Sequence, residues 1–254
     1  MCRDGQRVDE DDIISRILHF DEFDCFYQTE WVPRKISIDW IIDPTCPMYA
    51  MQSIDENKKP FIVIRQLPDT IDDAFLVAHE MGHVIKYFDK QYMEFMRAPT
   101  PIAKMYKEEE IKDMGNILGS MVDDPLIDSW LQDKYGFSPA HFYSSVLMPG
   151  TFESLDSYGD PPYEWHIFKK ALYYSQLSLQ MESIRDKDTL REWDRLKERY
   201  RTRRPKVTRI GEELYSLSRE RGFDSIEKQR QLFSEILNRY RINSIKLGDI
   251  LHMK

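Results

Sequence analysis

The order of apolar and polar positions along the chain predicts two strands and a helix in its first third. Residues 35–42 (KISIDWII) and 61–67 (FIVIRQL) are short runs of β-branched and apolar residues with prolines and charged residues around them, which is typical of strands. Residues 72–88 (DDAFLVAHEMGHVIKYF) follow, with apolar residues three or four apart, the period of an amphipathic helix. We expect its buried stripe to consist of Ile71, Phe75, Ala78, Met81 and Ile85.

The helical period recurs through most of the remaining chain. A stripe near residues 111–122 predicts a long helix whose buried positions are Ile111, Met114, Ile117, Leu118, Met121 and Val122. Capping residues and glycine or proline stops predict further helices near residues 163–184, 186–203, 208–221 and 224–241. An amphipathic pattern over residues 11–23 predicts another. The expected fold class is therefore α+β and mostly helical, with a small sheet.

The helix expected at residues 72–88 also contains the pattern H-E-x-x-H. His79 and His83 are four residues apart, so their side chains share a helix face and can bind one metal ion. Glu80 lies beside them, where a carboxylate can act as general base. The alternative is a buried helix in which both histidines only pack or bond to carbonyl groups. The place of the pattern inside an amphipathic helix favours the metal site.

Strands that lead into an H-E-x-x-H helix resemble the first half of the zincin metallopeptidases, and the compact chain looks most like their gluzincin-type members. The resemblance covers about residues 35–90 and extends, with fewer matching features, to about 185. It implies a zincin-like small mixed sheet over an active-site helix, additional C-terminal helices and one Zn²⁺ ion. It also implies that an extended substrate peptide is added to the sheet edge as an antiparallel strand.

A catalytic zinc site needs a third protein ligand. Gluzincin-like enzymes take it from a later helix as a carboxylate, and an Asp four residues on orients a ligand histidine. Two pairs in this sequence have that spacing: Glu109 with Asp113, and Asp124 with Asp128. The stripe at residues 111–122 places the second pair beside the buried side of the helix and the first pair among lysines on the solvent side. We therefore predict Asp124 as the third ligand and Asp128 as the orienting residue.

Several alternatives stay open at this site. Asp123 and then Glu109 are the next candidates for the third ligand. Asp89, at the position that metzincin spacing would select, is disfavoured because the glycine that turns the metzincin chain back is missing. Asp124 followed by Pro125 could instead be the N-cap of a new helix. Donors that could stabilise an oxyanion, none of them preferred, are His141, Tyr143, Tyr158, Tyr163 and His166.

Composition and charge add an expected organisation. A chain of 254 residues with 41% hydrophobic residues can bury a large core, and we expect a domain at residues 1–184 with a helical extension at 185–254. The extension has 19 Lys/Arg against 12 Asp/Glu, and the domain has 17 against 32. The basic cluster at residues 195–209 fits a nucleic-acid or membrane surface. Because acidic residues are interleaved, we favour a solvated helix face that docks on the acidic domain.

The expected function follows from these features together. No run of 18 apolar residues is present, and Cys2, Cys25 and Cys46 are too few and too scattered for a disulfide framework, which favours a reducing cytoplasm. The sequence predicts a soluble zinc metallopeptidase with Glu80 as general base and a peptide or protein as substrate, and neither membrane nor nucleic acid as partner. The alternative is a zincin-like binding or regulatory protein that holds metal but has little or no general proteolytic activity. The oligomeric state is left open.

Overall fold

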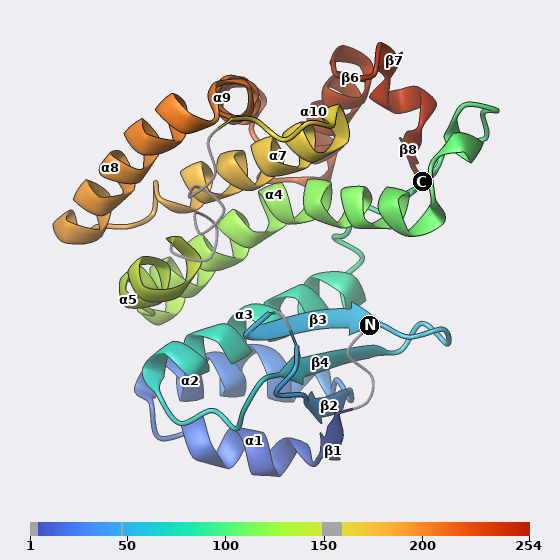
Figure 1. Cartoon of the computed structure of the whole chain (residues 1–254). Helices are drawn as coiled ribbons and strands as arrows, with labels where there is room; N and C mark the ends of the chain where they lie inside the picture. The colour runs from blue at the N-terminus through green and yellow to red at the C-terminus, as the bar shows by residue number, and fades with distance from the viewer. Residues whose placement is uncertain (1–4, 47, 149–158) are drawn as a thin grey trace. The chain divides into compact units, whose positions relative to one another are not determined.

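The fold is mostly helical with one small mixed sheet, as the sequence predicts. The computed structural model describes residues 5–46, 48–148 and 159–254. It is 62% helical with a four-stranded sheet, which confirms the α+β class (Figure 1). Contacts divide the chain into unit 1, Met1–Lys90 with Ile127–His141, and unit 2, Gln91–Leu126 with Phe142–Lys254. The boundary expected between residues 184 and 185 lies inside unit 2.

The sheet of unit 1 has the order β1-β2-β4-β3. Its strands are β1 (Gln6–Val8), β2 (Asp39–Ile42), β3 (Ala50–Ile54) and β4 (Pro60–Ile64). Strands β2 and β4 are parallel, and β1 and β3 are antiparallel to their neighbours at the two edges. Every residue of β4 is buried, which explains its continuous apolar run. The two expected strands are present but shorter, and β3 was not predicted.

Helix α3 (Ile71–Phe88) follows β4 and contains the H-E-x-x-H pattern. It begins with a capping box, in which the Thr70 hydroxyl accepts from the Asp73 N–H at 3.1 Å and the Asp73 carboxylate accepts from the Thr70 N–H at 3.0 Å. Four residues of the expected stripe are buried, but Ile71 is 39% exposed, so its assignment to the core was wrong. Ile71 lies in the first turn, whereas residues from Ala74 onward are covered on several faces.

Helix α4 (Glu108–Tyr135) is continuous and passes from unit 2 into unit 1 between Leu126 and Ile127. All six residues of its expected stripe are buried. Pro125 lies inside this helix, so the alternative in which Asp124 is the N-cap of a new helix is wrong. The proline has no N–H to donate to the Met121 carbonyl, and the helix continues without that bond.

A buried carboxylate fixes the C-terminal end of α4 within unit 1. Glu30 accepts hydrogen bonds from Lys134 Nζ at 2.6 Å, from Arg34 Nη1 at 2.8 Å and from the Tyr135 hydroxyl. Burial opposes the charge of Glu30, but these donors outweigh it and lower the pKa of the carboxyl below its ordinary value. Glu30 lies in η1 (Tyr27–Trp31), which follows α1 (Glu10–Ile17) and α2 (Asp21–Phe26).

Four helices form most of unit 2, close to where the sequence predicts them. They are α7 (Glu164–Gln180), α8 (Lys187–Arg203), α9 (Pro205–Arg221) and α10 (Ile226–Arg239). Asp186 and Ser225 cap α8 and α10, and Gly222, with φ of 72°, ends α9. Two short strand pairs were not predicted: β5 (Phe95–Arg97) with β8 (Leu251–Met253), and β6 (Arg241–Ile242) with β7 (Ile245–Lys246).

The described residues also contain several short helices. These are η2 (Val32–Arg34), η3 (Ala103–Met105), α5 (Ala140–Phe142), η4 (Tyr143–Leu147) and η6 (Leu247–Asp249). A search of the described residues finds no helix with the length and apolar character needed to cross a membrane.

The close approach of α3 and the last part of α4 in unit 1 gives a test of the packing. A Cβ atom at Gly82 would lie 2.8 Å from Ile127 Cγ2, and Ile127 is buried. We predict that Gly82→Ala lowers the free energy of unfolding by about 1–3 kcal/mol through overpacking, despite the better helix propensity of alanine. Urea denaturation followed by circular dichroism measures the change. In an Ile127→Ala background the loss should shrink, and an equal loss in both backgrounds would contradict the steric explanation.

Candidate metal site

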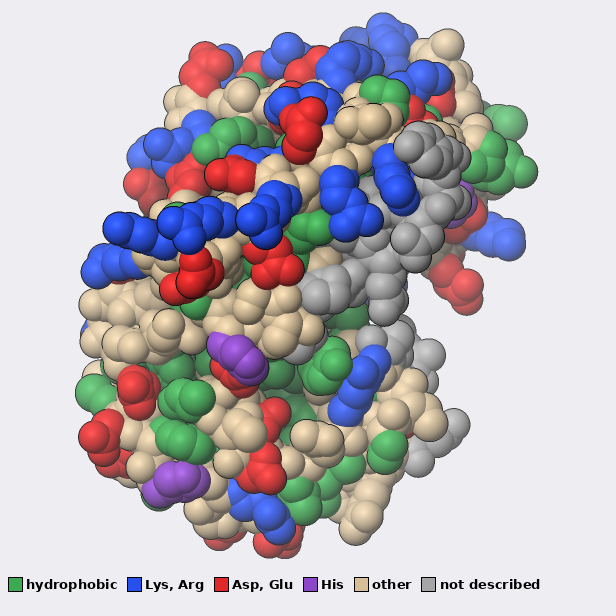
Figure 2. All heavy atoms as spheres, turned by 60° about the vertical axis from the view of Figure 1, so that its left-hand side comes forward, with side chains coloured by type: hydrophobic (Ala, Val, Ile, Leu, Met, Phe, Trp, Pro, Cys, Tyr) green, Lys and Arg blue, Asp and Glu red, His purple; other side chains and the backbone are tan. Residues whose placement is uncertain are grey.

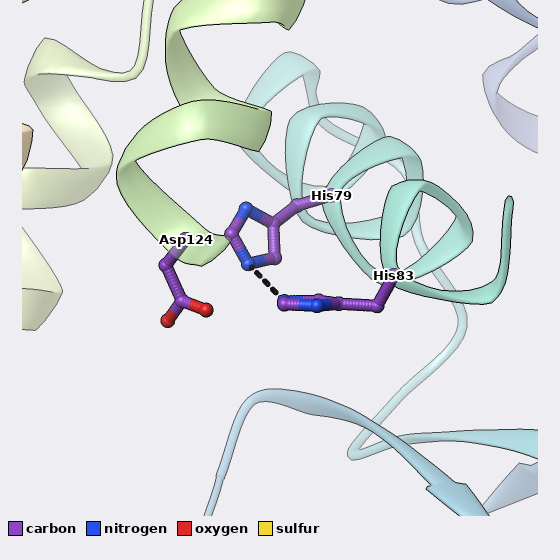
Figure 3. A group of neighbouring side chains, drawn as sticks. All are labelled: His79, His83 and Asp124. Carbon is purple, nitrogen blue, oxygen red and sulfur yellow. Dashed lines mark hydrogen bonds between the residues drawn. The ribbon is translucent and has the colours of Figure 1, made fainter. Parts of the chain in front are cut away.

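The two histidines of α3 present their Nε2 atoms to the same point in space. His79 Nε2 and His83 Nε2 are 3.1 Å apart, as the dashed line in Figure 3 shows. Two nitrogen ligands at about 2.05 Å from one tetrahedral zinc ion are about 3.3 Å apart. The separation of the imidazoles therefore fits two ligands of a single ion.

Asp128 of α4 holds the His79 ring by its other nitrogen. Asp128 Oδ1 lies 2.7 Å from His79 Nδ1, and the carboxylate is 1% exposed. Because an ionised carboxylate only accepts hydrogen bonds, the proton is on Nδ1 and the lone pair is on Nε2. Metal-binding histidines are commonly oriented by a carboxylate in this way. The orienting role of Asp128 stays a prediction, and this contact is the observation that supports it.

Asp124 offers the third ligand atom. It lies one helical turn before Asp128 on α4 and is drawn with the two histidines in Figure 3. One ligand atom from each of His79, His83 and Asp124 lies within 4.8 Å of the others. Gln176 Nε2, from α7, donates to Asp124 Oδ2 at 2.7 Å and orients the carboxylate.

The other candidates for the third ligand lie elsewhere. Asp123 is buried and its Oδ1 accepts from Gln229 Nε2 at 3.5 Å, and Glu109 is exposed near the start of α4. Asp89, at the end of α3, forms an ion pair with Arg34 at 3.3 Å. Over the described residues, the group of His, Cys, Asp and Glu side chains that could hold a metal ion is His79, His83 and Asp124.

The general-base candidate contacts a strand that the sequence analysis missed. Glu80 is 8% exposed, and its Oε2 accepts a hydrogen bond of 2.6 Å from the backbone N–H of Gln52. Gln52 is the middle residue of the edge strand β3, so this N–H points away from the neighbouring β4. The contact places the Glu80 carboxylate at the sheet edge. The sequence of this strand, AMQSI (50–54), is too short and too mixed in polarity for the strand to be predicted from it.

The structure does not single out one of the expected oxyanion donors. In unit 1, His141 is bonded to Asp72 through Nδ1. In unit 2, Tyr143 is fully buried, and the rings of Tyr163 and His166 meet edge-on at 5.9 Å. Tyr158 lies outside the described residues, as does Cys2. The residue that would stabilise an oxyanion therefore stays unassigned.

Comparisons with known proteins do not place this chain in a family. No family model matches it, and neither a search of curated proteins nor a search of solved structures found a match. The resemblance to zincins therefore stays a prediction, and the function is argued from the geometry of the site.

The bond between Asp128 and His79 predicts a measurable effect on metal binding. Asp128→Asn removes the negative charge beside the imidazole, and we expect zinc affinity to fall by about 10–100-fold. Competition with a chromophoric chelator measures the affinity. Asp113→Asn is the matched control, because Asp113 lies on the same helix and pairs with Lys169 instead. Equal zinc affinities for the two variants would contradict the orienting role.

Proposed function

We propose that this protein is a zinc-dependent metallopeptidase. The observation that carries the proposal is the spacing of His79 Nε2 and His83 Nε2, 3.1 Å apart, with the Asp128 carboxylate behind the first ring. Asp124 supplies the third ligand, and Glu80 is the adjacent carboxylate. Two histidines and a carboxylate are a ligand set that catalytic zinc sites use, with one position left for water.

The proposed mechanism assigns a separate role to each side chain. Zinc held by His79, His83 and Asp124 would polarise the scissile carbonyl and lower the pKa of a bound water towards about 7. Asp128 keeps His79 in the tautomer that directs a lone pair to the metal. Glu80 takes the proton from the attacking water and passes it to the leaving amine. The Gln52 N–H fixes the position of the Glu80 carboxylate while it does so.

The substrate class that fits this site is an extended peptide. Strand β3 is the sheet edge next to Glu80, and its outward-facing backbone groups can pair with a peptide added as an antiparallel strand. Main-chain pairing would bring the peptide bond alongside α3 without requiring one particular side chain.

We also propose that the protein acts in a reducing compartment, the cytoplasm. Cys25 and Cys46 are both free thiols in the described part of the chain, the first exposed and the second buried. Free exposed thiols persist where glutathione and thioredoxin keep them reduced.

Substitution of the general base tests the proposed activity. Glu80→Gln should retain zinc and slow hydrolysis of a denatured protein or peptide library by about 10²–10⁴-fold, because the proton acceptor is lost. Product formation is measured with and without a chelator, and Glu109→Gln controls for the loss of one carboxylate. Zinc binding without turnover in the unsubstituted protein would instead support the alternative of a binding or regulatory protein. In such a protein, the bond between Glu80 and the Gln52 backbone would serve only to stabilise the fold.

Removal of the third ligand tests the ligand assignment separately. Asp124→Ala should reduce zinc affinity more than the roughly 10–100-fold expected from losing an orienting residue. Asp123→Asn and Glu109→Gln should leave the metal content unchanged. If Asp124→Ala retains stoichiometric zinc while either of the other variants loses it, the ligand has been assigned to the wrong carboxylate.

A further inference from the structure

Exposed arginines of the C-terminal helices differ in whether they form ion pairs. Those that form ion pairs are Arg191 with Asp188, Arg201 with Glu198 and Glu212, Arg209 with Glu213, Arg219 with Glu182, and Arg221 with Glu235. Arg195 and Arg199 are also exposed, but neither forms an ion pair with any described residue. The basic cluster therefore contains arginines to which the described residues supply no counter-ion.

Three exposed arginines lie in a row on α8. Arg191, Arg195 and Arg199 follow one another at intervals of four residues, which places them on one face about 6 Å apart along the helix axis. Together with Asp188, Glu192 and Leu196, they line an open hollow of about 500 Å³. Arg191 is bonded to Asp188, yet 70% of its side chain is exposed. Figure 2, in which the α8 side of Figure 1 is turned forward, shows a row of Lys and Arg side chains on this face of unit 2.

We propose that this arginine row of α8 binds the phosphate backbone of a nucleic-acid duplex. The guanidinium group presents a planar fork of donors that matches phosphate oxygens and stays charged at any physiological pH. Each strand of a duplex carries one charge per about 3.4 Å of its axis, so a row of about 12 Å reaches several phosphates. The interaction requires no base contacts and is therefore independent of sequence.

The apolar residues of α8 favour a duplex over other polyanions. Trp193 and Tyr200 are 4% and 2% exposed, and no large hydrophobic side chain of α8 is exposed. A helix that lies on a membrane needs an exposed apolar face, and a surface for single strands needs exposed aromatic rings for stacking. The arginine row has neither, whereas a duplex presents only its charged backbone to such a surface.

Two negative contributions limit the strength of the interaction. Asp188 and Glu192 are both exposed in the same hollow, and the first 184 residues carry a large excess of acidic side chains. Charges farther away than about 8 Å are largely screened at physiological ionic strength, so the groups in direct contact dominate. We therefore expect weak, salt-dependent binding in the range of about 10⁻⁴–10⁻⁶ M.

Anisotropy of a labelled 20-base-pair DNA duplex, titrated with the full chain at several salt concentrations, tests this proposal. Arg195→Ala with Arg199→Ala should reduce the slope of log K against log salt by about two and weaken binding roughly tenfold at low salt. Arg209→Ala with Arg219→Ala changes the net charge equally but removes arginines that are already paired, so it should change the slope little. Glu192→Gln should strengthen binding.

Three results would overturn the proposal. The first is an equal loss of DNA affinity in the two double variants, and the second is absence of DNA binding at low salt. The third is displacement of the duplex by polyglutamate at equal charge concentration, which would assign the arginine row to an acidic protein partner. Circular dichroism of each variant shows whether it is folded. Zinc and peptidase activity do not enter the measurement, so the outcome is independent of the proposed function.

Discussion

The hydrogen bond between Asp128 and His79 is the constraint on which the candidate site depends. It joins the helix that carries the histidines to the part of α4 that belongs to unit 1. The bond also selects the His79 tautomer whose lone pair faces His83. About two turns beyond Asp128, Lys134 and Tyr135 donate to Glu30 and hold the end of α4 in unit 1.

The parts of the site that sequence analysis could predict are those set by helical phase. His79 and His83 share a face because they are four residues apart, and Asp124 and Asp128 lie together for the same reason. The predicted buried stripe of α4 placed these two aspartates beside the core and Glu109 on the solvent side, and Glu109 is exposed in the structure. These relations are local to one helix, so they follow from residue spacing and do not require knowledge of the tertiary fold.

The contacts that could not be predicted join residues far apart in the sequence. Gln52 reaches Glu80 through a backbone N–H, and a backbone donor carries no sequence pattern. Strand β3 exists because it pairs with β4, not because its five residues favour an extended form. The pairing of Arg219 with Glu182, and the lack of a counter-ion for Arg195 among the described residues, likewise depend on helix packing. Composition alone showed a basic cluster but not which of its charges are neutralised.

Pro125 has a mechanical consequence for the two aspartates on either side of it. Because it cannot donate to the Met121 carbonyl, α4 lacks one backbone hydrogen bond in the turn that contains Asp124. The Asp124 carboxylate is held from outside this helix, by the hydrogen bond of 2.7 Å that Gln176 of α7 donates to it.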